Sequence, residues 1–173
     1  MATKVTGGEY KSRALKTPEG KTTRPTGSRV REALFNILGC VAQQKFVDLY
    51  AGSGSVGIEA SSRGAAEVIL VENGRQAIQC IKDNIQLLKA SNITLKSMDA
   101  EKYCETTPDS SIDILFCDPP FVEVYPDFSG ALSLLREGGV AIFQYPTREK
   151  ISWLSSADKI KKYGESSLAF FYK

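Results

Sequence analysis

Five short apolar segments recur along the chain at intervals long enough to hold a helix. Three of the stretches between them, residues 55–63, 75–90 and 129–136, have the composition and spacing of helices. Strands separated by helix-length connections predict right-handed crossovers and a mainly parallel sheet, which is an α/β fold. The expected strands are Lys45–Tyr50, Glu67–Glu72, Ile93–Met98, Ile112–Asp118 and Val140–Tyr145.

The C-terminal part departs from this alternation. Residues 158–163 and 167–173 are strand-like and flank a Gly164-Glu165-Ser166 turn with no helix between them. Such a pair predicts a final β-hairpin. We therefore expect residues 39–173 to form one domain that ends in a hairpin.

The N-terminal part carries most of the positive charge. Residues 1–31 hold eight lysines and arginines against two glutamates, a net charge of +6, although the whole chain is only +2. This asymmetry suggests a basic arm for a polyanion, but a solvated tail explains the charge equally well. Ser28 is the expected N-cap of a helix over residues 29–38. We expect residues 1–38 to be a basic extension and helix that packs on the core.

Composition excludes several classes of protein. With 173 residues, 42% hydrophobic and 24% charged, the chain fits one globular domain. No apolar run reaches the roughly 18–20 residues that span a bilayer, and the N-terminus lacks the apolar core of a secretory signal. Histidine is absent, which excludes histidine triads and histidine metal sites, so no metal is expected. No exposed apolar helix requires a partner, so we expect a monomer.

The cysteines indicate the compartment. They show no CxxC spacing and lie in apolar segments, so we interpret them as reduced core residues of a cytoplasmic protein. They are Cys40, Cys80, Cys104 and Cys117.

A glycine-rich turn follows the first expected strand. Asp48-Leu49-Tyr50-Ala51-Gly52-Ser53-Gly54 ends that strand and opens a helix. With Gly57 it forms a G-x-G-x-x-G pattern, so a dinucleotide must be considered. Asp48 would repel a pyrophosphate but would attract the ammonium group of a methionine moiety. The pattern and its acid therefore favour S-adenosylmethionine.

Acidic residues also end the next two strands. Glu72 can bind both hydroxyls of a ribose, and Asp99 can accept a hydrogen bond from an adenine amino group, with the Ala100 N–H nearby. Because ligands bind beyond the carboxyl ends of parallel strands, we expect these residues to lie near the glycine-rich turn.

The segment Asp118-Pro119-Pro120-Phe121 follows the fourth expected strand. An exocyclic amino group on a base is a poor nucleophile because its lone pair is delocalised into the ring. The Asp118 carboxylate and the Pro119 carbonyl could accept its two N–H hydrogens and direct the lone pair towards a methyl donor. Phe121 could stack on the base. The motif predicts amino methylation, and positioning should supply much of the rate.

Further motifs run along nearly the whole chain. They are Gly7–Arg13, Leu15–Pro18, Thr23–Thr26, Arg29–Leu38, Asp48–Gly54, Glu59-Ala60, Ser62–Ala65, Glu72, Asn84, Asp99-Ala100 and Asp118–Phe121. Together they resemble the bacterial 16S ribosomal RNA guanine-N2 methyltransferases that act on the small subunit. The resemblance implies a Rossmann-like class I S-adenosylmethionine-dependent methyltransferase, with a seven-stranded sheet covered by helices on both faces. It implies methylation of a guanine N2 in 16S rRNA, within assembled or assembling small subunits.

The resemblance also implies residue roles. By matching position, the cofactor would be bound by Asp48, Gly52, Ser53, Gly54, Glu72, Asp99 and Ala100. The target guanine would be held by Asp118, Pro119 and Phe121. The N-terminal segment would be organised over the site, or RNA contacted, by Arg13, Arg24, Thr26, Arg29 and Arg31.

Three residues depart from the family pattern, and one of them, Tyr50, is a mild change from the more usual phenylalanine. Ser28 stands where the family usually has aspartate, and Gln144 follows the late strand where an acid is common.

Three other functions remain open from the residues. A DNA adenine or cytosine amino-methyltransferase has the same motif but usually adds a target-recognition domain. A non-catalytic RNA-binding module and a nicotinamide-dependent oxidoreductase are the other two.

Overall fold

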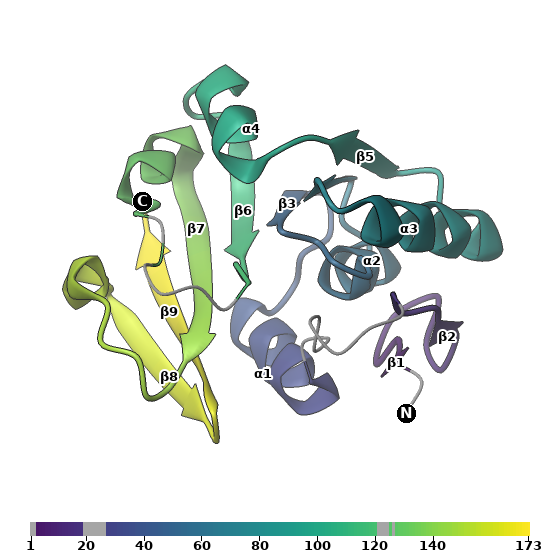
Figure 1. Cartoon of the computed structure of the whole chain (residues 1–173), viewed down its shortest axis with the longest axis horizontal. Coiled ribbons are helices and arrows are strands. Elements are labelled where there is room, and N and C mark those ends of the chain that lie inside the picture. The colour runs from purple at the N-terminus through teal and green to yellow at the C-terminus, as the bar shows by residue number, and fades with distance from the viewer. Residues whose placement is uncertain (1–2, 19–26, 121–124, 126) are drawn as a thin grey trace.

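A computed structural model describes residues 3–18, 27–120, 125 and 127–173. Its main sheet has seven strands in the order β5-β4-β3-β6-β7-β9-β8, and Figure 1 shows β7, β9 and β8 side by side at one end. This confirms the expected seven-stranded α/β fold. The strands are β3 (Lys45–Leu49), β4 (Glu67–Glu72), β5 (Ile93–Ser97), β6 (Ile112–Cys117), β7 (Leu135–Pro146), β8 (Lys159–Tyr163) and β9 (Ser166–Tyr172).

The first five strands of this sheet are parallel. Strand β3 lies between β4 and β6, with Asp48 opposite Leu70 and Phe116. From β3, the chain adds β4 and β5 on one side and then β6 and β7 on the other side. In α/β proteins, ligands bind at the carboxyl ends of the strands beside such a change of side. Strand β9 is antiparallel to both β7 and β8, which confirms the expected C-terminal hairpin.

Helices cover both faces of the sheet. Apolar side chains of α1 (Ser28–Leu38), α2 (Ser55–Ser62) and α3 (Arg75–Leu88) pack on one face. Those of α4 (Ala100–Thr106) and the 3-10 helices η1 (Ser129–Leu134) and η2 (Ser152–Ser156) pack on the other. Because both faces are covered, the central strands are apolar almost throughout, as in β4, where four successive residues are buried.

A small hairpin precedes the core. Strands β1 (Thr3–Lys4) and β2 (Ala14–Leu15) pair antiparallel and lie beside α2 and α3 (Figure 1). Val5 and Leu15 are buried against Ile58 of α2 and Leu88 of α3. The sequence pattern did not predict this hairpin, because its strands have only two residues each.

Several local predictions were wrong. The N-cap of α1 is Gly27, and Ser28 is already within the helix. Of residues 129–136, expected to be one helix, only Ser129–Leu134 are helical, as a 3-10 helix, and Leu135 joins the sheet opposite Ile112. Strand β7 therefore starts five residues earlier than expected, and Gln144 lies within it instead of following it. Helix α4 was not predicted.

The cysteines differ in exposure. All four thiols are free, but only Cys80 and Cys117 are buried, whereas Cys40 is exposed and Cys104 is half-buried. The interpretation of all four as core residues was therefore wrong for Cys40. Within the described ranges, no helix is both long and apolar enough to cross a membrane.

Candidate active site

A cavity of about 910 Å³ opens at the carboxyl ends of β3, β4, β6 and β7. It brings together six of the residues predicted from the sequence. These are Asp48, Gly52, Ser53, Glu72, Asp118 and Pro119. The opposite wall comes from the C-terminal strands, through Pro146–Arg148 and Tyr163–Ser166, which sequence reasoning did not include in the site. A further part of the lining is Pro18, Gly27 and Val30 of the N-terminal segment.

The glycine-rich turn has the backbone geometry that its sequence suggests. Gly52 (φ +57°) and Gly54 (φ +78°) are both left-handed, a conformation that favours glycine. The space beside the Gly52 Cα is open, so its backbone can approach a ligand. Gly54, the N-cap of α2, instead packs close to Leu70, where an added Cβ would lie 3.1 Å from the leucine Cδ1. Gly54 therefore shapes the turn but does not line the cavity.

Asp48 occupies the N-terminal end of α2. Its side chain is 1% exposed, and its Oδ2 accepts a hydrogen bond from the Gly57 N–H at 2.9 Å. Helix N-termini attract anions, and this carboxylate already takes that position. A pyrophosphate at the same place would meet the buried acid directly. The G-x-G-x-x-G pattern here is therefore not arranged for a dinucleotide.

Glu72 is held rigidly at the end of β4. Its Oε2 accepts the Gly52 N–H at 2.7 Å, and its Oε1 accepts the N–H groups of Asn73 at 3.0 Å and Gly74 at 2.7 Å. These bonds link β4 to the glycine-rich turn of β3. A carboxylate has about four acceptor positions, so it can still accept from a ligand hydroxyl.

Asp99 and Ala100 lie beyond the cavity lining. Asp99 is exposed at the N-cap of α4, and its Oδ1 accepts a hydrogen bond from the Asn73 Nδ2 at 2.6 Å. Asn73 itself lines the cavity, so Asp99 is connected to the cavity through Asn73. The Ala100 side chain is buried in the core. Its backbone, at the start of α4, is the only part that could face a ligand.

Asp118 is hydrogen-bonded to Gln144, a residue that stood out in the sequence only because it departs from the family pattern. The Gln144 Nε2 donates a hydrogen bond to the Asp118 Oδ2 at 3.0 Å, and both side chains line the cavity with Pro119. Sequence reasoning could not find this pair, because the two residues lie 26 positions apart on different strands. Phe121 lies outside the described residues.

The predicted RNA-binding residues separate into two groups. Arg13 and Arg29 are exposed, whereas Arg31 is fully buried. Of the two roles predicted for Arg31, its burial does not fit direct RNA contact but fits organisation of the N-terminal segment. Arg24 and Thr26 lie outside the described residues.

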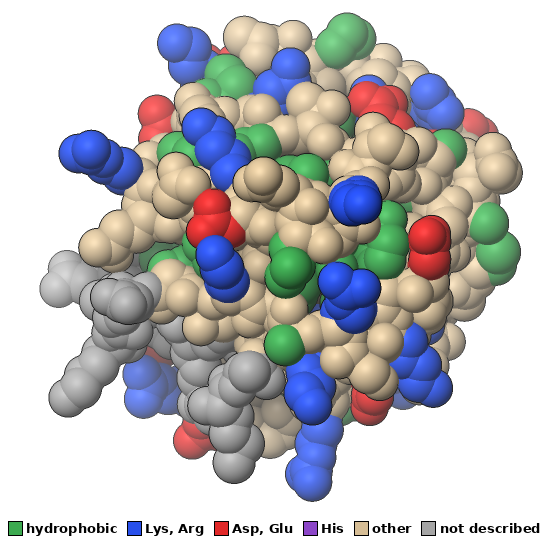
Figure 2. All heavy atoms as spheres, turned by 90° about the vertical axis from the view of Figure 1, so that its right-hand side faces the viewer, with side chains coloured by type: hydrophobic (Ala, Val, Ile, Leu, Met, Phe, Trp, Pro, Cys, Tyr) green, Lys and Arg blue, Asp and Glu red, His purple; other side chains and the backbone are tan. Residues whose placement is uncertain are grey.

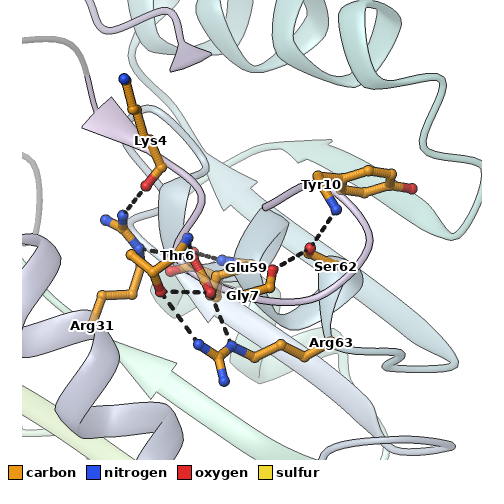
Figure 3. A network of polar contacts seen from close by, with 10 residues as sticks. Lys4, Thr6, Gly7, Tyr10, Arg31, Glu59, Ser62 and Arg63 are labelled. Carbon is orange, nitrogen blue, oxygen red and sulfur yellow. Dashed lines mark hydrogen bonds and ion pairs between the residues drawn. The ribbon is translucent and has the colours of Figure 1, made fainter. Parts of the chain in front are cut away.

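Arg31 instead belongs to a buried network centred on Glu59 (Figure 3). The Arg31 Nε lies 3.3 Å from the Glu59 Oε2, and the Arg63 Nε lies 2.9 Å from the Oε1. Thr6 donates to the same carboxylate from its N–H and its hydroxyl, at 2.8 and 2.7 Å. The Arg31 guanidinium also donates to the Lys4 carbonyl oxygen. The network thereby ties the N-terminal segment to α1 and α2.

Asn84 makes a second connection to the N-terminal segment. Its side chain is fully buried, exchanges two hydrogen bonds with the backbone of Lys16 (2.8 and 3.0 Å) and donates to the Ser53 carbonyl oxygen at 3.1 Å. The glycine-rich turn and the N-terminal segment are thus held by one amide. From the sequence, Asn84 was indicated only by the family resemblance.

Comparison with known proteins places this arrangement in a family. The family model described as conserved hypothetical protein 95 matches residues 3–172. The chain belongs to this family. Ribosomal RNA small subunit methyltransferase D of Escherichia coli is 38% identical over 121 residues, which is 68% of this chain and 60% of that protein. The chain therefore matches less than two thirds of the length of that relative.

Two solved structures share the fold of this chain over nearly its whole length. The yhhF protein of Escherichia coli superposes with a TM-score of 0.82 at 27% identity and covers 100% of this chain and 98% of its own. A hypothetical protein of Thermus thermophilus gives a TM-score of 0.83 at 27% identity, over 97% of this chain and 98% of its own. The resemblance to the small-subunit rRNA methyltransferases predicted from the sequence is confirmed.

Proposed function

We propose that this member of the family is an S-adenosylmethionine-dependent methyltransferase that modifies a guanine N2 in the 16S rRNA of the small ribosomal subunit. The observation that carries this proposal is the position of Asp118 and Pro119. They line the same cavity as Asp48 and Glu72, so the groups suited to a base and those suited to a cofactor face one space.

The charges of the cavity suit a cationic cofactor. Asp48, Glu72 and Asp118 all line it. Burial raises the pKa of Asp48 well above its ordinary value, and the Asp118 and Glu72 carboxylates raise it further. The ammonium and sulfonium groups of S-adenosylmethionine would relieve this repulsion, whereas a pyrophosphate would increase it. Glu72, already fixed by three N–H donors, would accept the ribose hydroxyls.

The chemistry required of the protein is orientation. Bound S-adenosylmethionine supplies an electrophilic methyl group on sulfur. Asp118 and the Pro119 carbonyl accept the two hydrogens of the amino group, which directs the nitrogen lone pair away from the ring. The amino nitrogen, oriented by Asp118 and Pro119, would take the methyl group that the cofactor supplies. The nitrogen would then lose one proton, which the Asp118 carboxylate, one of its two acceptors, could take up. Proline at position 119 restricts φ and stiffens the loop.

The surface beside the N-terminal hairpin suits RNA. Figure 2 shows Lys and Arg side chains spread over this face, with Asp and Glu side chains among them. Exposed basic residues of the hairpin region are Lys4, Lys11, Arg13 and Lys16. Basic clusters bind the phosphate backbone without reading sequence. We propose that this face and Arg29 dock the rRNA, that the substrate is a ribosomal particle in the cytoplasm, and that the protein acts as a monomer.

A methylation assay tests the proposal. Small-subunit particles that lack the modification and, in a parallel reaction, unmethylated DNA are incubated with the protein and radiolabelled S-adenosylmethionine, and the labelled nucleotide is mapped. We expect label in one guanine of 16S rRNA, recovered as N2-methylguanine. Label recovered only in DNA, or only in adenine or cytosine, would overturn the assignment and favour the DNA amino-methyltransferase.

A second test concerns Asp48. Because its pKa is raised in the folded protein, its contribution to stability is complete at acid pH and is lost as pH rises through the folded pKa. Asp48→Asn keeps an oxygen for the Gly57 N–H but cannot ionise. We expect the cofactor-free variant to unfold at a higher temperature than the wild-type protein at neutral pH, and the difference to shrink at low pH.

The same variant should lose cofactor affinity, because it lacks the charge that attracts the ammonium group. We expect binding of S-adenosylmethionine, measured by calorimetric titration, to weaken roughly tenfold or more. Unchanged affinity at neutral pH would remove Asp48 from the proposed cofactor site.

A further inference from the structure

Gln144 stands beside the proposed reaction centre. Strands β6 and β7 are parallel and pair Cys117 with Phe143, so Asp118 and Gln144 are the next residues on the two strands. Neighbouring strands lie about 4.8 Å apart, and residues at matching positions point to the same face. The 3.0 Å bond from the Gln144 Nε2 to the Asp118 Oδ2 closes the gap between them.

This bond fixes the orientation of the Gln144 amide. An ionised carboxylate only accepts hydrogen bonds, so the NH₂ group must face Asp118 and the carbonyl oxygen must face elsewhere. The side chain is 8% exposed, and its Oε1 is buried with no hydrogen-bond partner. Within the described part of the chain, the only other buried side-chain nitrogen or oxygen without a hydrogen-bond partner is the Trp153 Nε1. Trp153 does not line the main cavity.

An unpartnered buried oxygen costs folding free energy, and such atoms are rare in folded proteins. Here the atom belongs to a residue that lines the cavity beside the acceptor of the amino group. The ligand that satisfies it must present a hydrogen-bond donor next to an exocyclic amino group. The three candidate bases differ at that position. Guanine has the N1–H beside N2, whereas adenine has the bare N1 beside N6 and cytosine has the bare N3 beside N4.

We infer that Gln144 selects guanine by accepting its N1–H through Oε1 while Asp118 accepts from N2. The inference rests on the proposed function and adds the residue that reads the base. Adenine or cytosine would place a lone pair against Oε1. The amide cannot reverse to donate to them, because its oxygen would then face the Asp118 carboxylate. Gln144 is thus a specificity residue that contacts the substrate.

The empty protein keeps Oε1 covered, so the amide shifts towards the cavity when the base enters, while Nε2 keeps its bond to the Asp118 Oδ2. Two features permit this. No partner holds Oε1 in its present place, and the glutamine side chain has rotatable bonds between the backbone and the amide. Gln144→Met has a similar length and volume but neither accepts nor donates a strong hydrogen bond.

The experiment compares two bases in two proteins. Small-subunit particles are reconstituted with 16S rRNA that carries either guanine or 2-aminopurine at the methylated position. 2-Aminopurine keeps the exocyclic amino group but has no hydrogen on N1. Wild-type protein should prefer guanine by roughly 10- to 100-fold in kcat/KM, the value of one buried hydrogen bond. Gln144→Met should lose rate on guanine by about that factor and change little on 2-aminopurine, so the preference disappears.

Gln79→Met is the matched control, because Gln79 is exposed on α3 and bonds only Asp83 among the contacts recorded for it. It should keep the wild-type preference. A Gln144→Met variant that loses the same factor on both bases would show a structural role and overturn the inference, as would a wild-type protein that accepts both bases equally. If wild-type protein methylates no guanine at all, the proposed function itself fails. The outcomes are therefore distinguishable.

Discussion

Asp118→Ala should lower kcat for methyl transfer by roughly 10²- to 10⁴-fold, the range expected when a positioned acid–base group is removed. The variant loses the acceptor that orients the amino group and takes its proton. It should still bind S-adenosylmethionine, because Asp48 and Glu72, the carboxylates proposed to hold the cofactor, are unchanged. Single-turnover methylation of small-subunit particles measures the chemical step, and calorimetric titration measures cofactor binding.

The fold should survive this change, because Asp118 lines the cavity and the Gln144 bond, one of the contacts that it loses, is a single hydrogen bond. A net stability loss of about 1 kcal/mol is expected for such a bond. Asp109→Ala is a suitable control, since Asp109 is exposed and accepts a bond from Ser133 far from the cavity. Near wild-type turnover by Asp118→Ala, with the control also active, would refute the proposed chemistry.

Glu59→Ala should produce the largest loss of stability among these variants. Both Glu59 and Arg31 are fully buried, and the change leaves the Arg31 charge without its carboxylate. Removing one partner of a buried ion pair typically costs about 3–5 kcal/mol. For a chain of this size, each kcal/mol lowers Tm by about 2–4 °C, so a fall on the order of 10 °C is expected. Thermal unfolding at neutral pH measures it.

The N-terminal segment should loosen first in this variant. The Thr6 N–H and hydroxyl both lose their acceptor, so amide exchange at Thr6 should accelerate more than exchange in β4. Glu67→Ala is the matched control. Its ion pair with Lys45 is partly exposed, at 3.4 Å, and should be worth at most about 1 kcal/mol.

A double change separates charge burial from lost packing. Arg31→Met combined with Glu59→Leu removes both charges and keeps apolar volume, and such replacements are often neutral or stabilising. We expect it to recover much of the stability that Glu59→Ala loses. A double variant as unstable as Glu59→Ala would mean that hydrogen bonds to Thr6 and Arg63 carry the effect.

Much of the fold could be predicted from local pattern. Strands β3, β4, β5 and β6 begin where the apolar segments predicted and end within one residue of it. Buried parallel strands are apolar along their whole length, so short runs of sequence reveal them. Residues 129–136 were mispredicted because Leu135 pairs with Ile112 in the sheet, and that contact lies outside any local window. Gly130 also weakens an α-helix there.

The residues of the candidate site could be predicted in part for the same reason. Asp48 lies one residue before the end of β3, Glu72 ends β4 and Asp118 follows β6, and parallel strands bring their carboxyl ends to one edge. Glycines in the turn after β3 were likewise predictable, because the left-handed conformation there favours them. Strand pattern and strand-end chemistry therefore indicated the fold class, the position of the cavity and its acidic character.

Only the tertiary structure could assign the remaining partners. Whether Arg31 faces RNA or a buried acid depends on Glu59, which lies 28 positions away. Whether Gln144 is incidental or paired with Asp118 depends on the register of β6 and β7. Hydrogen bonds and ion pairs act over a few ångströms, and the residues they join are brought together by packing of the sheet. Charge and pattern along the chain could identify the groups, but not which of them meet.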